Sequence, residues 1–330
     1  MNRLWYYAAL VLATLAWGVE IVVGKYAVTG IGAFTTLFVE CGTAAAFLWV
    51  LMLLRRRRTP RRVPLRHYTF LGLLEPFVCY GALNVGLLTA AATDAALLLA
   101  LLPVIVLVLG VLFAHERVGV RGLTGALIST AGAVVLTTAD LNVVGGFGDL
   151  FILLANFGAA GAVLVVNRLS SKADALEITA YQFGIGFLMT IPVMVVVWLT
   201  GFEPVPGMSH LPQLVSAAAV GVGAFAIAYL AYNYAVGKVS VGLAGVALNL
   251  IPLFGVLSAV LFLGETVGPT QWIAGALLLG GLLLFPVGDQ GQPAPAPIAQ
   301  EAVHVSRQPD DEPDDEPDRQ PGSRAGSSHP

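Results

Sequence analysis

The sequence predicts an all-α membrane protein of ten transmembrane helices, arranged as two inverted five-helix repeats and followed by a disordered acidic C-terminal tail. Three observations predict it. First, 57% of the 330 residues are hydrophobic and only 11% are charged, whereas soluble domains carry about 25% charged residues. Second, apolar runs of membrane-spanning length recur along the chain. Third, distinctive residues repeat at a constant offset. Together they exclude a soluble globular protein, and the net charge of −3 gives no reason to expect nucleic-acid binding.

Apolar runs near the roughly 20 residues that a helix needs to cross the hydrocarbon occur ten times. The first is longer than the apolar part of a signal peptide, which predicts an uncleaved span. The predicted spans are Leu4–Val28, Ala33–Leu54, Tyr68–Ala90, Asp94–Phe113, Val120–Ala139, Asp149–Leu169, Leu176–Thr200, Pro212–Val236, Val241–Leu263 and Thr270–Val287.

Basic residues in the short loops predict the orientation, because cytoplasmic loops are enriched in Lys and Arg. With ten spans and a cytoplasmic N-terminus, all basic residues before position 288 except Lys25 fall on the cytoplasmic side. The largest cluster is the run from Arg55 to Arg66, which either anchors the topology or binds lipid head groups. We therefore expect a multi-pass protein of the cell (inner) membrane with both termini in the cytoplasm.

An offset of 149 residues superimposes the two halves at residues that chance would not match in a chain rich in Leu, Ala and Val. The matched pairs are Gly72 and Gly221, Tyr80 and Tyr229, Asn84 and Asn233, Pro103 and Pro252, and Glu116 and Glu265. Because each half holds five spans, an odd number, the second half begins on the opposite side of the membrane. The predicted domains are residues 1–140, residues 141–287 as the inverted repeat, and a tail at 288–330 whose Pro- and acid-rich composition favours disorder. Inverted repeats are typical of secondary transporters, with the substrate site at the repeat interface.

These features resemble the EamA-type permeases of the drug/metabolite transporter superfamily. The resemblance is carried by Trp17-Gly18 followed by Lys25, and by two copies of a segment, Leu101–Gly132 and Asn249–Gly281, in which a glutamate follows a proline by thirteen positions. It implies a ten-helix fold with a central cavity and export of amino acids, related metabolites or drugs. This chain departs from the family pattern at Glu40, where an arginine is common, which argues against an anionic substrate.

Charged residues within spans are costly and mark candidate functional sites. Four stand out: Glu20, Lys25, Glu40 and Glu75. Lys25 and Glu40 lie at similar depth, so they form either a structural ion pair or part of the site. Glu20 shares a helical face with Trp17 and is expected to face the cavity. Our hypothesis is that Glu20 or Glu75 couples transport to protons or contacts a cationic group of the solute.

Glu75 precedes Pro76, which weakens the local helix and predicts a bend in the third span. Elsewhere, hydroxyls and amides lie one turn apart. In lipid such groups bond across helices or line a wet cavity, and both interpretations remain open, although tyrosines also offer a ring for stacking. These candidate residues are Tyr80, Asn84, Tyr229, Tyr232 and Asn233. Pro103 and Pro252 are expected to bend the fourth and ninth spans, either as fixed bends or as gating hinges.

The motifs of metalloproteases, serine hydrolases and phosphate-binding loops are absent from the sequence, and Cys41 and Cys79 lack metal-ligand spacing. We therefore predict a transporter and not an enzyme, without cofactor or metal. The expected partners are a small-molecule substrate, membrane lipids and, in a coupled mechanism, protons. A lipid translocator and an intramembrane enzyme are the alternative functions.

Overall fold

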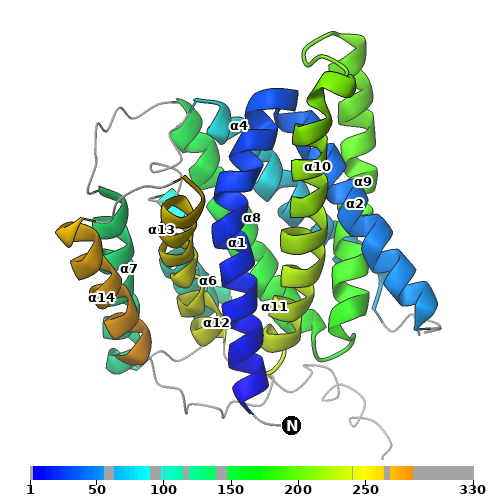
Figure 1. Ribbon diagram of the computed structural model, residues 1–330. Coiled ribbons are helices and arrows are strands. Elements are labelled where there is room, and N and C mark those ends of the chain that lie inside the picture. The colour runs from blue at the N-terminus through cyan, green and yellow to red at the C-terminus, as the bar shows by residue number, and fades with distance from the viewer. Residues whose placement is uncertain are drawn as a thin grey trace, which may run out of the picture. The chain divides into compact units, whose positions relative to one another are not determined.

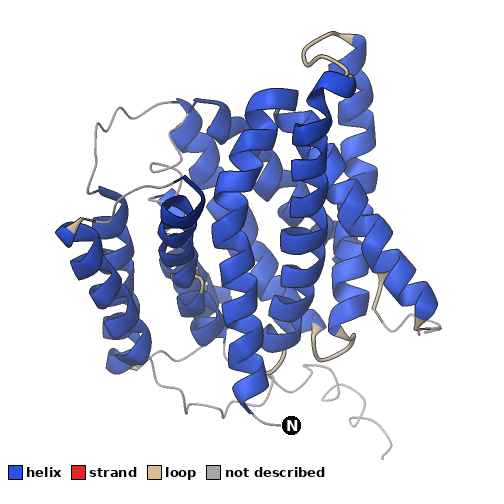
Figure 2. Cartoon of the chain, in the orientation of Figure 1, coloured by secondary structure: helices blue, strands red, loops and turns tan. Residues whose placement is uncertain are grey.

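The computed structural model describes residues 3–55, 63–89, 98–99, 101–113, 119–138, 147–239, 241–263 and 268–284. Within these ranges the regular elements are helices, and none is a strand (Figure 2). The predicted tail, most of the basic run after Arg55, and both repeat glutamates, Glu116 and Glu265, lie outside the described residues.

The helices of the first half are α1 (Arg3–Ile31), α2 (Ala33–Leu54), α3 (Leu65–Gly72), η1 (Leu73–Val78), α4 (Cys79–Thr89), α6 (Leu102–Phe113) and α7 (Val120–Thr138). Those of the second half are α8 (Phe147–Leu169), α9 (Ala175–Leu199), η2 (Met208–His210), α10 (Leu211–Val220), η3 (Gly221–Ala228), α11 (Tyr229–Val236), α12 (Val241–Ala247), α13 (Leu250–Leu263) and α14 (Pro269–Leu284). Among the described residues, six helical stretches are long and apolar enough to cross a membrane, and shorter apolar helices accompany them.

Most helix ends lie within a few residues of the predicted spans, and α2 has the predicted bounds. The predicted ninth span differs, because it is divided into α12 and α13 by a turn at Leu248 and Asn249. The ring of Pro252 clashes with a helical carbonyl four residues earlier, at Leu248, which favours a break at this turn. Pro103 lies in the first turn of α6, where a proline is tolerated because that N–H needs no helical partner.

The third predicted span of each half is interrupted by a short π-helix, η1 in the first half and η3 in the second. Glu75 in η1 has an extended backbone, with φ −152° and ψ 119°. The following Pro76 disfavours the α region for Glu75, which explains this break. The sequence predicts the bend at η1, but η3 contains no proline and no bend is predicted there.

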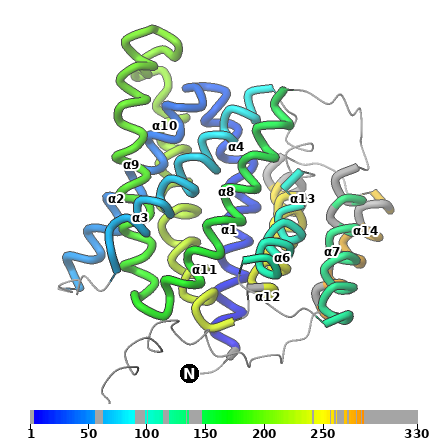
Figure 3. Tube along the Cα trace, turned by 180° about the vertical axis from the view of Figure 1, so that it is seen from behind, coloured from blue at the N-terminus to red at the C-terminus, as the bar shows by residue number. Residues whose placement is uncertain are grey.

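The first helix of each half packs against later helices of the other half. α1 contacts α10, η3, α11 and α13, whereas α8 contacts η1, α4 and α6. These two helices run in opposite directions (Figures 1 and 3). α2 and α9 pack against each other, as do α7 and α14. The interface between the halves is therefore formed by α1 and α8, by the two interrupted helices, and by the pairs α2–α9 and α7–α14.

Two glycines show that the close contacts across this interface repeat. Gly72 lies against the backbone of Gln182 on α9, and an added Cβ would sit 2.9 Å from that residue's carbonyl oxygen. Gly221, 149 positions later, lies in the same way against the backbone carbonyl of Glu40 on α2. Each interrupted helix thus uses a glycine to approach the second long helix of the other half.

Candidate functional site

A central cavity of about 90 Å³ lies where the two halves meet. It is lined by groups from α1, α2, the interrupted helices, α6, α8 and α13. Its polar and aromatic lining residues are Trp17, Glu20, Glu40, Glu75, Cys79, Tyr80, Asn84, Tyr229 and Tyr232. Eight of these nine, all except Cys79, are predicted site residues, so the fold brings together groups that are far apart in sequence.

Tyr80 and Tyr229, which are equivalent in the repeat, meet directly. Their hydroxyl oxygens are 3.0 Å apart, and the residues are 149 positions apart. In a molecule with two-fold related halves, equivalent residues touch each other only near the symmetry axis. This contact therefore locates the pseudo-symmetry axis of the repeat at the wall of the central cavity.

Glu75 bonds to the second half through both carboxylate oxygens. Tyr229 donates its hydroxyl to Oε1 at 2.6 Å, and Gln182 donates its amide to Oε2 at 3.3 Å. A hydroxyl carries one proton, so when Tyr229 donates to Glu75 its contact with Tyr80 must be accepted from the Tyr80 hydroxyl. Glu75 is only 7% exposed, and its position at the break in η1 directs it away from its own helix.

Trp17 forms an aromatic wall of the cavity from α1. Its indole lies 4.8 Å from the ring of Tyr229 and 5.1 Å from that of Tyr232, both in edge-to-face arrangements. The indole N–H donates to the carbonyl of Ala224 at 3.2 Å. Trp17 therefore joins the first helix to the interrupted helix of the second half and fixes the two rings beside it.

The remaining carboxylates come from α1 and α2. Glu40 is 2% exposed and accepts a bond of 3.4 Å from the amide of Asn84, which is also 3.4 Å from the carbonyl of Ala33. Glu20 is less buried and lines the same cavity. Three carboxylates thus share one small cavity, and its described lining contains neither Lys nor Arg.

The other predicted site residues lie near this cavity without lining it. Lys25 follows the lining residue Gly24 on α1, and its pairing with Glu40 stays a prediction. Pro103 and Pro252 adjoin the lining residues Leu102 and Ile251. The role of these two prolines as hinges likewise stays a prediction.

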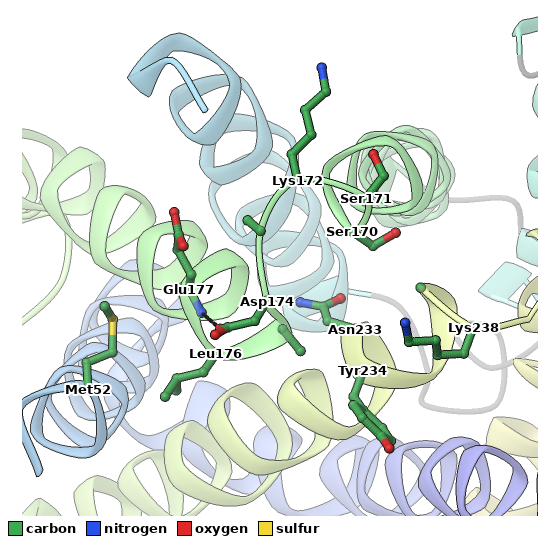
Figure 4. A pocket seen from close by; sticks show the side chains of 13 residues that line it. Met52, Ser170, Ser171, Lys172, Asp174, Leu176, Glu177, Asn233, Tyr234 and Lys238 are labelled. Atoms are coloured by element: carbon green, nitrogen blue, oxygen red, sulfur yellow. Dashed lines mark hydrogen bonds between the residues drawn. The ribbon is translucent and has the colours of Figure 1, made fainter. Parts of the chain in front are cut away.

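Asn233, the repeat counterpart of Asn84, lies behind the cavity. Its amide donates to Gln182 at 3.2 Å and to the hydroxyl of Thr179 at 3.0 Å. It lines a different pocket, of about 510 Å³, between the α8–α9 turn and the end of α11. Figure 4 shows Asn233 between Asp174 and Lys238 in the wall of this α8–α9 pocket.

Gln182 is not among the residues that the sequence predicts for the site, although it is fully buried and donates a hydrogen bond to Glu75. An available signal lies in a second offset. α2 and α9 begin 142 positions apart at Ala33 and Ala175, and at this offset Glu40 aligns with Gln182, each followed two positions later by glycine. Because the offset changes from 142 for these helices to 149 for the interrupted helices, a comparison at the single offset of 149 does not align Glu40 with Gln182.

The chain belongs to the EamA-like transporter family. The family model matches twice, over residues 4–138 and 146–286, which covers both halves and confirms the predicted family and its two-repeat architecture. With the long apolar helices, this membership makes the chain a multi-pass membrane transporter.

Relatives and a solved structure agree with this assignment. A Streptantibioticus cattleyicolor protein named "Probable terminal-alkyne amino-acid exporter" is 26% identical, covering 84% of this chain and 92% of its own length. The Bacillus subtilis "Uncharacterized transporter YetK" is 23% identical, covering 89% of this chain and 90% of its own length. A solved crystal structure of a protein, 20% identical, has the same fold with a TM-score of 0.72, covering 86% of this chain and 96% of that one.

Proposed function

We propose that the protein is a secondary active exporter of small amphipathic metabolites, namely amino acids, amines or cationic drugs, that works by alternating access. The observation that carries the proposal is the cavity at the repeat axis, where Glu20, Glu40 and Glu75 converge beside the contact between Tyr80 and Tyr229. A site on the axis of two similar halves can be exposed to either side by the same motion of one half against the other.

The charge of the cavity indicates the class of solute. Three like charges in one small, largely buried space repel one another and need neutralisation by protons or by a cation. The described lining residues supply no Lys or Arg for this purpose. The solute therefore carries an amino or other cationic group, and protons occupy the carboxylates when the solute leaves. Glu75, bonded to both Tyr229 and Gln182, is the proposed coupling residue.

The aromatic wall supports an amphipathic solute. Trp17, Tyr229 and Tyr232 pack edge to face and present ring surface together with hydroxyl groups, which suits an apolar body that carries a polar head. The relative named as an amino-acid exporter has the same two halves over most of its length, so amino acids are the first solutes to test.

We also propose a membrane topology for the chain. The chain crosses the cell (inner) membrane ten times as two inverted repeats, residues 1–140 and 141–287, with both termini in the cytoplasm. The opposite directions of α1 and α8 support the inversion (Figure 1), and the basic loops support the orientation. The partners are the solute, protons and membrane lipids. The protein acts as a transporter, not as an enzyme, and needs no cofactor.

A counterflow screen in proteoliposomes tests the function. Vesicles are loaded with unlabelled amino acids, amines, cationic drugs or organic anions, and entry of the labelled solute is followed with and without an imposed pH gradient. We expect exchange of a zwitterionic or cationic solute and none of organic anions. Exchange of organic anions alone, or lipid scrambling without solute exchange, would overturn the proposal in favour of a different cargo or a lipid translocator.

A further inference from the structure

Two hydrogen bonds connect the wall of the central cavity to the wall of the α8–α9 pocket. Glu75 lines the central cavity and accepts from Gln182 at 3.3 Å. Gln182 accepts from Asn233 at 3.2 Å, and Asn233 lines the α8–α9 pocket. A chain of three side chains therefore links a residue in the wall of one space to a residue in the wall of the other.

The pair Gln182–Asn233 is the second-half counterpart of Glu40–Asn84. Asn233 follows Asn84 by 149 positions, Gln182 follows Glu40 by 142, and each pair is joined by a hydrogen bond from the asparagine amide. Gly72 and Gly221 approach the backbones of Gln182 and Glu40 in the same way. Both the side-chain hydrogen bond and the close backbone contact are repeated. Glu40 and Gln182 are therefore equivalent positions in the two halves, as are Asn84 and Asn233.

The two pairs differ in what they face. Glu40 and Asn84 both line the central cavity, whereas neither Gln182 nor Asn233 is among its described lining residues. On the Asn84 side, the amide also reaches the carbonyl of Ala33, at the start of α2. On the Asn233 side, the corresponding space beside the start of α9 is the open α8–α9 pocket.

We propose that Gln182 and Asn233 form the partition that closes the central cavity toward the α8–α9 pocket, and that this pocket is the entry vestibule for the solute. Gln182 also acts as a positioning residue, because its amide holds the Glu75 carboxylate against Tyr229. The vestibule role rests on the proposed transport function. The partition itself is a property of the resting protein and can be tested without a solute.

The side-chain amides of Gln182 and Asn233 suit a partition that can open. The amide groups of both residues can exchange their hydrogen bonds for bonds to water or to a polar solute once the helices move. The vestibule lining contains both signs of charge, from Lys172, Lys238, Asp174 and Glu177 (Figure 4). A polar solute with separated charges fits such a wall better than a lipid chain does.

The two native cysteines allow a direct test. Cys79 lines the central cavity, whereas Cys41 is buried outside its described lining. In a Cys41→Ser background, membrane vesicles of known orientation receive a membrane-impermeant cationic thiol reagent from one face at a time, and modification of Cys79 is followed by mass. An N-terminal tag identifies the face, because the α8–α9 turn and the N-terminus lie at the same end (Figure 3). Leu83→Cys, also in the cavity lining, replaces Cys79 as the reporter if that thiol proves unreactive.

We expect Gln182→Ala and Asn233→Ala each to raise the modification rate about tenfold, only for reagent added from the N-terminal face. The double exchange Gln182→Asn with Asn233→Gln keeps the same two amides and the same combined length, so it should restore slow modification. Thr190→Val is the matched control, because its hydroxyl is buried on the same helix and bonds to the carbonyl of Phe187.

An unchanged rate in both alanine variants, or an equal increase in Thr190→Val, would overturn the partition. Thermal unfolding in detergent identifies a variant that has lost its fold, and the exchange variant then decides the outcome. If labelling behaves as expected but no solute exchanges in the counterflow screen, the proposed function fails while the partition stands.

Discussion

The interrupted helices of the two halves occupy equivalent positions but contain different chemistry. In the first, Pro76 forces Glu75 out of the helix, and the carboxylate at the break bonds to Gln182 and Tyr229. In the second, the residue 149 positions after Glu75 is Ala224, and its carbonyl accepts the indole N–H of Trp17. Both halves thus interrupt the same helix, but only the first half has an ionisable side chain at the interruption. This asymmetry makes the first half the proposed site of proton binding.

Removing the carboxylate should have the largest effect. Glu75→Leu leaves the Gln182 amide and the Tyr229 hydroxyl without their buried acceptor, and it removes the proposed coupling group. We expect counterflow of the solute to fall by more than about a hundredfold. Folding is checked by size-exclusion chromatography of the detergent-solubilised protein. A monodisperse variant that transports at the wild-type rate would contradict the assignment of Glu75.

Tyr229→Phe should have the next largest effect. The change removes the 2.6 Å bond to Glu75 and the contact with Tyr80 while keeping the ring. A hydrogen bond to a charged group is worth about 1.5–3 kcal/mol, so we expect at least about a tenfold loss in the initial rate of counterflow. Tyr232→Phe is the matched control, because it removes a hydroxyl that bonds to the carbonyl of Ala244 at 3.5 Å and leaves the bond from Tyr229 to Glu75 in place. Equal losses of counterflow rate in the two variants would mean that the loss in Tyr229→Phe is not caused by removal of its bond to Glu75.

The second interrupted helix should be less sensitive. Trp17→Phe keeps an aromatic wall but leaves the carbonyl of Ala224 without the indole donor. A neutral hydrogen bond contributes about 1 kcal/mol, so we expect about a threefold to tenfold reduction in the initial rate. The response to a pH gradient should persist because Glu75 is untouched. Loss of that response in Trp17→Phe, measured in the same vesicles, would show that the two breaks are not functionally distinct.

The smallest effect on transport is expected far from both breaks. Glu203 accepts from the backbone N–H groups of Phe34 and Thr35 and from the Thr35 hydroxyl, at 2.8–2.9 Å, at the start of α2. Glu203→Ala removes this cap and should lower the free energy of unfolding by about 1–2 kcal/mol. Thermal unfolding in detergent measures that loss. Transport per folded molecule should stay within about twofold of wild type, and a larger drop would extend the functional region to this turn.

Much of the fold follows from sequence because membrane spans obey a simple length and polarity rule. The bounds of α2 were predicted from its apolar run alone. Local chemistry also predicts the break at Glu75, since the effect of proline on the preceding residue is short-range. The break at η3 has no such signal. It depends on packing of Gly221 against Glu40 and on the bond from Trp17, both of which come from distant parts of the chain.

The polar lining of the central cavity follows from sequence to a similar extent. Ionisable residues such as Glu20, Glu40 and Glu75 stand out in apolar spans because burying them is costly. Gln182 carries no charge and did not stand out, although it has the same place in the repeat as Glu40. The separation of Asn233 from the central cavity depends on which space each helix face meets, and periodicity along one helix does not determine that.

Glu75 is the proposed link between solute movement and protons in the cavity at the repeat axis. This role is tested by comparing wild type with Glu75→Gln in proteoliposomes, measuring counterflow without a pH gradient and solute accumulation with one. We expect Glu75→Gln to exchange solute but no longer to accumulate it in response to the gradient. Accumulation by Glu75→Gln equal to that of wild type would show that Glu75 is not the coupling residue.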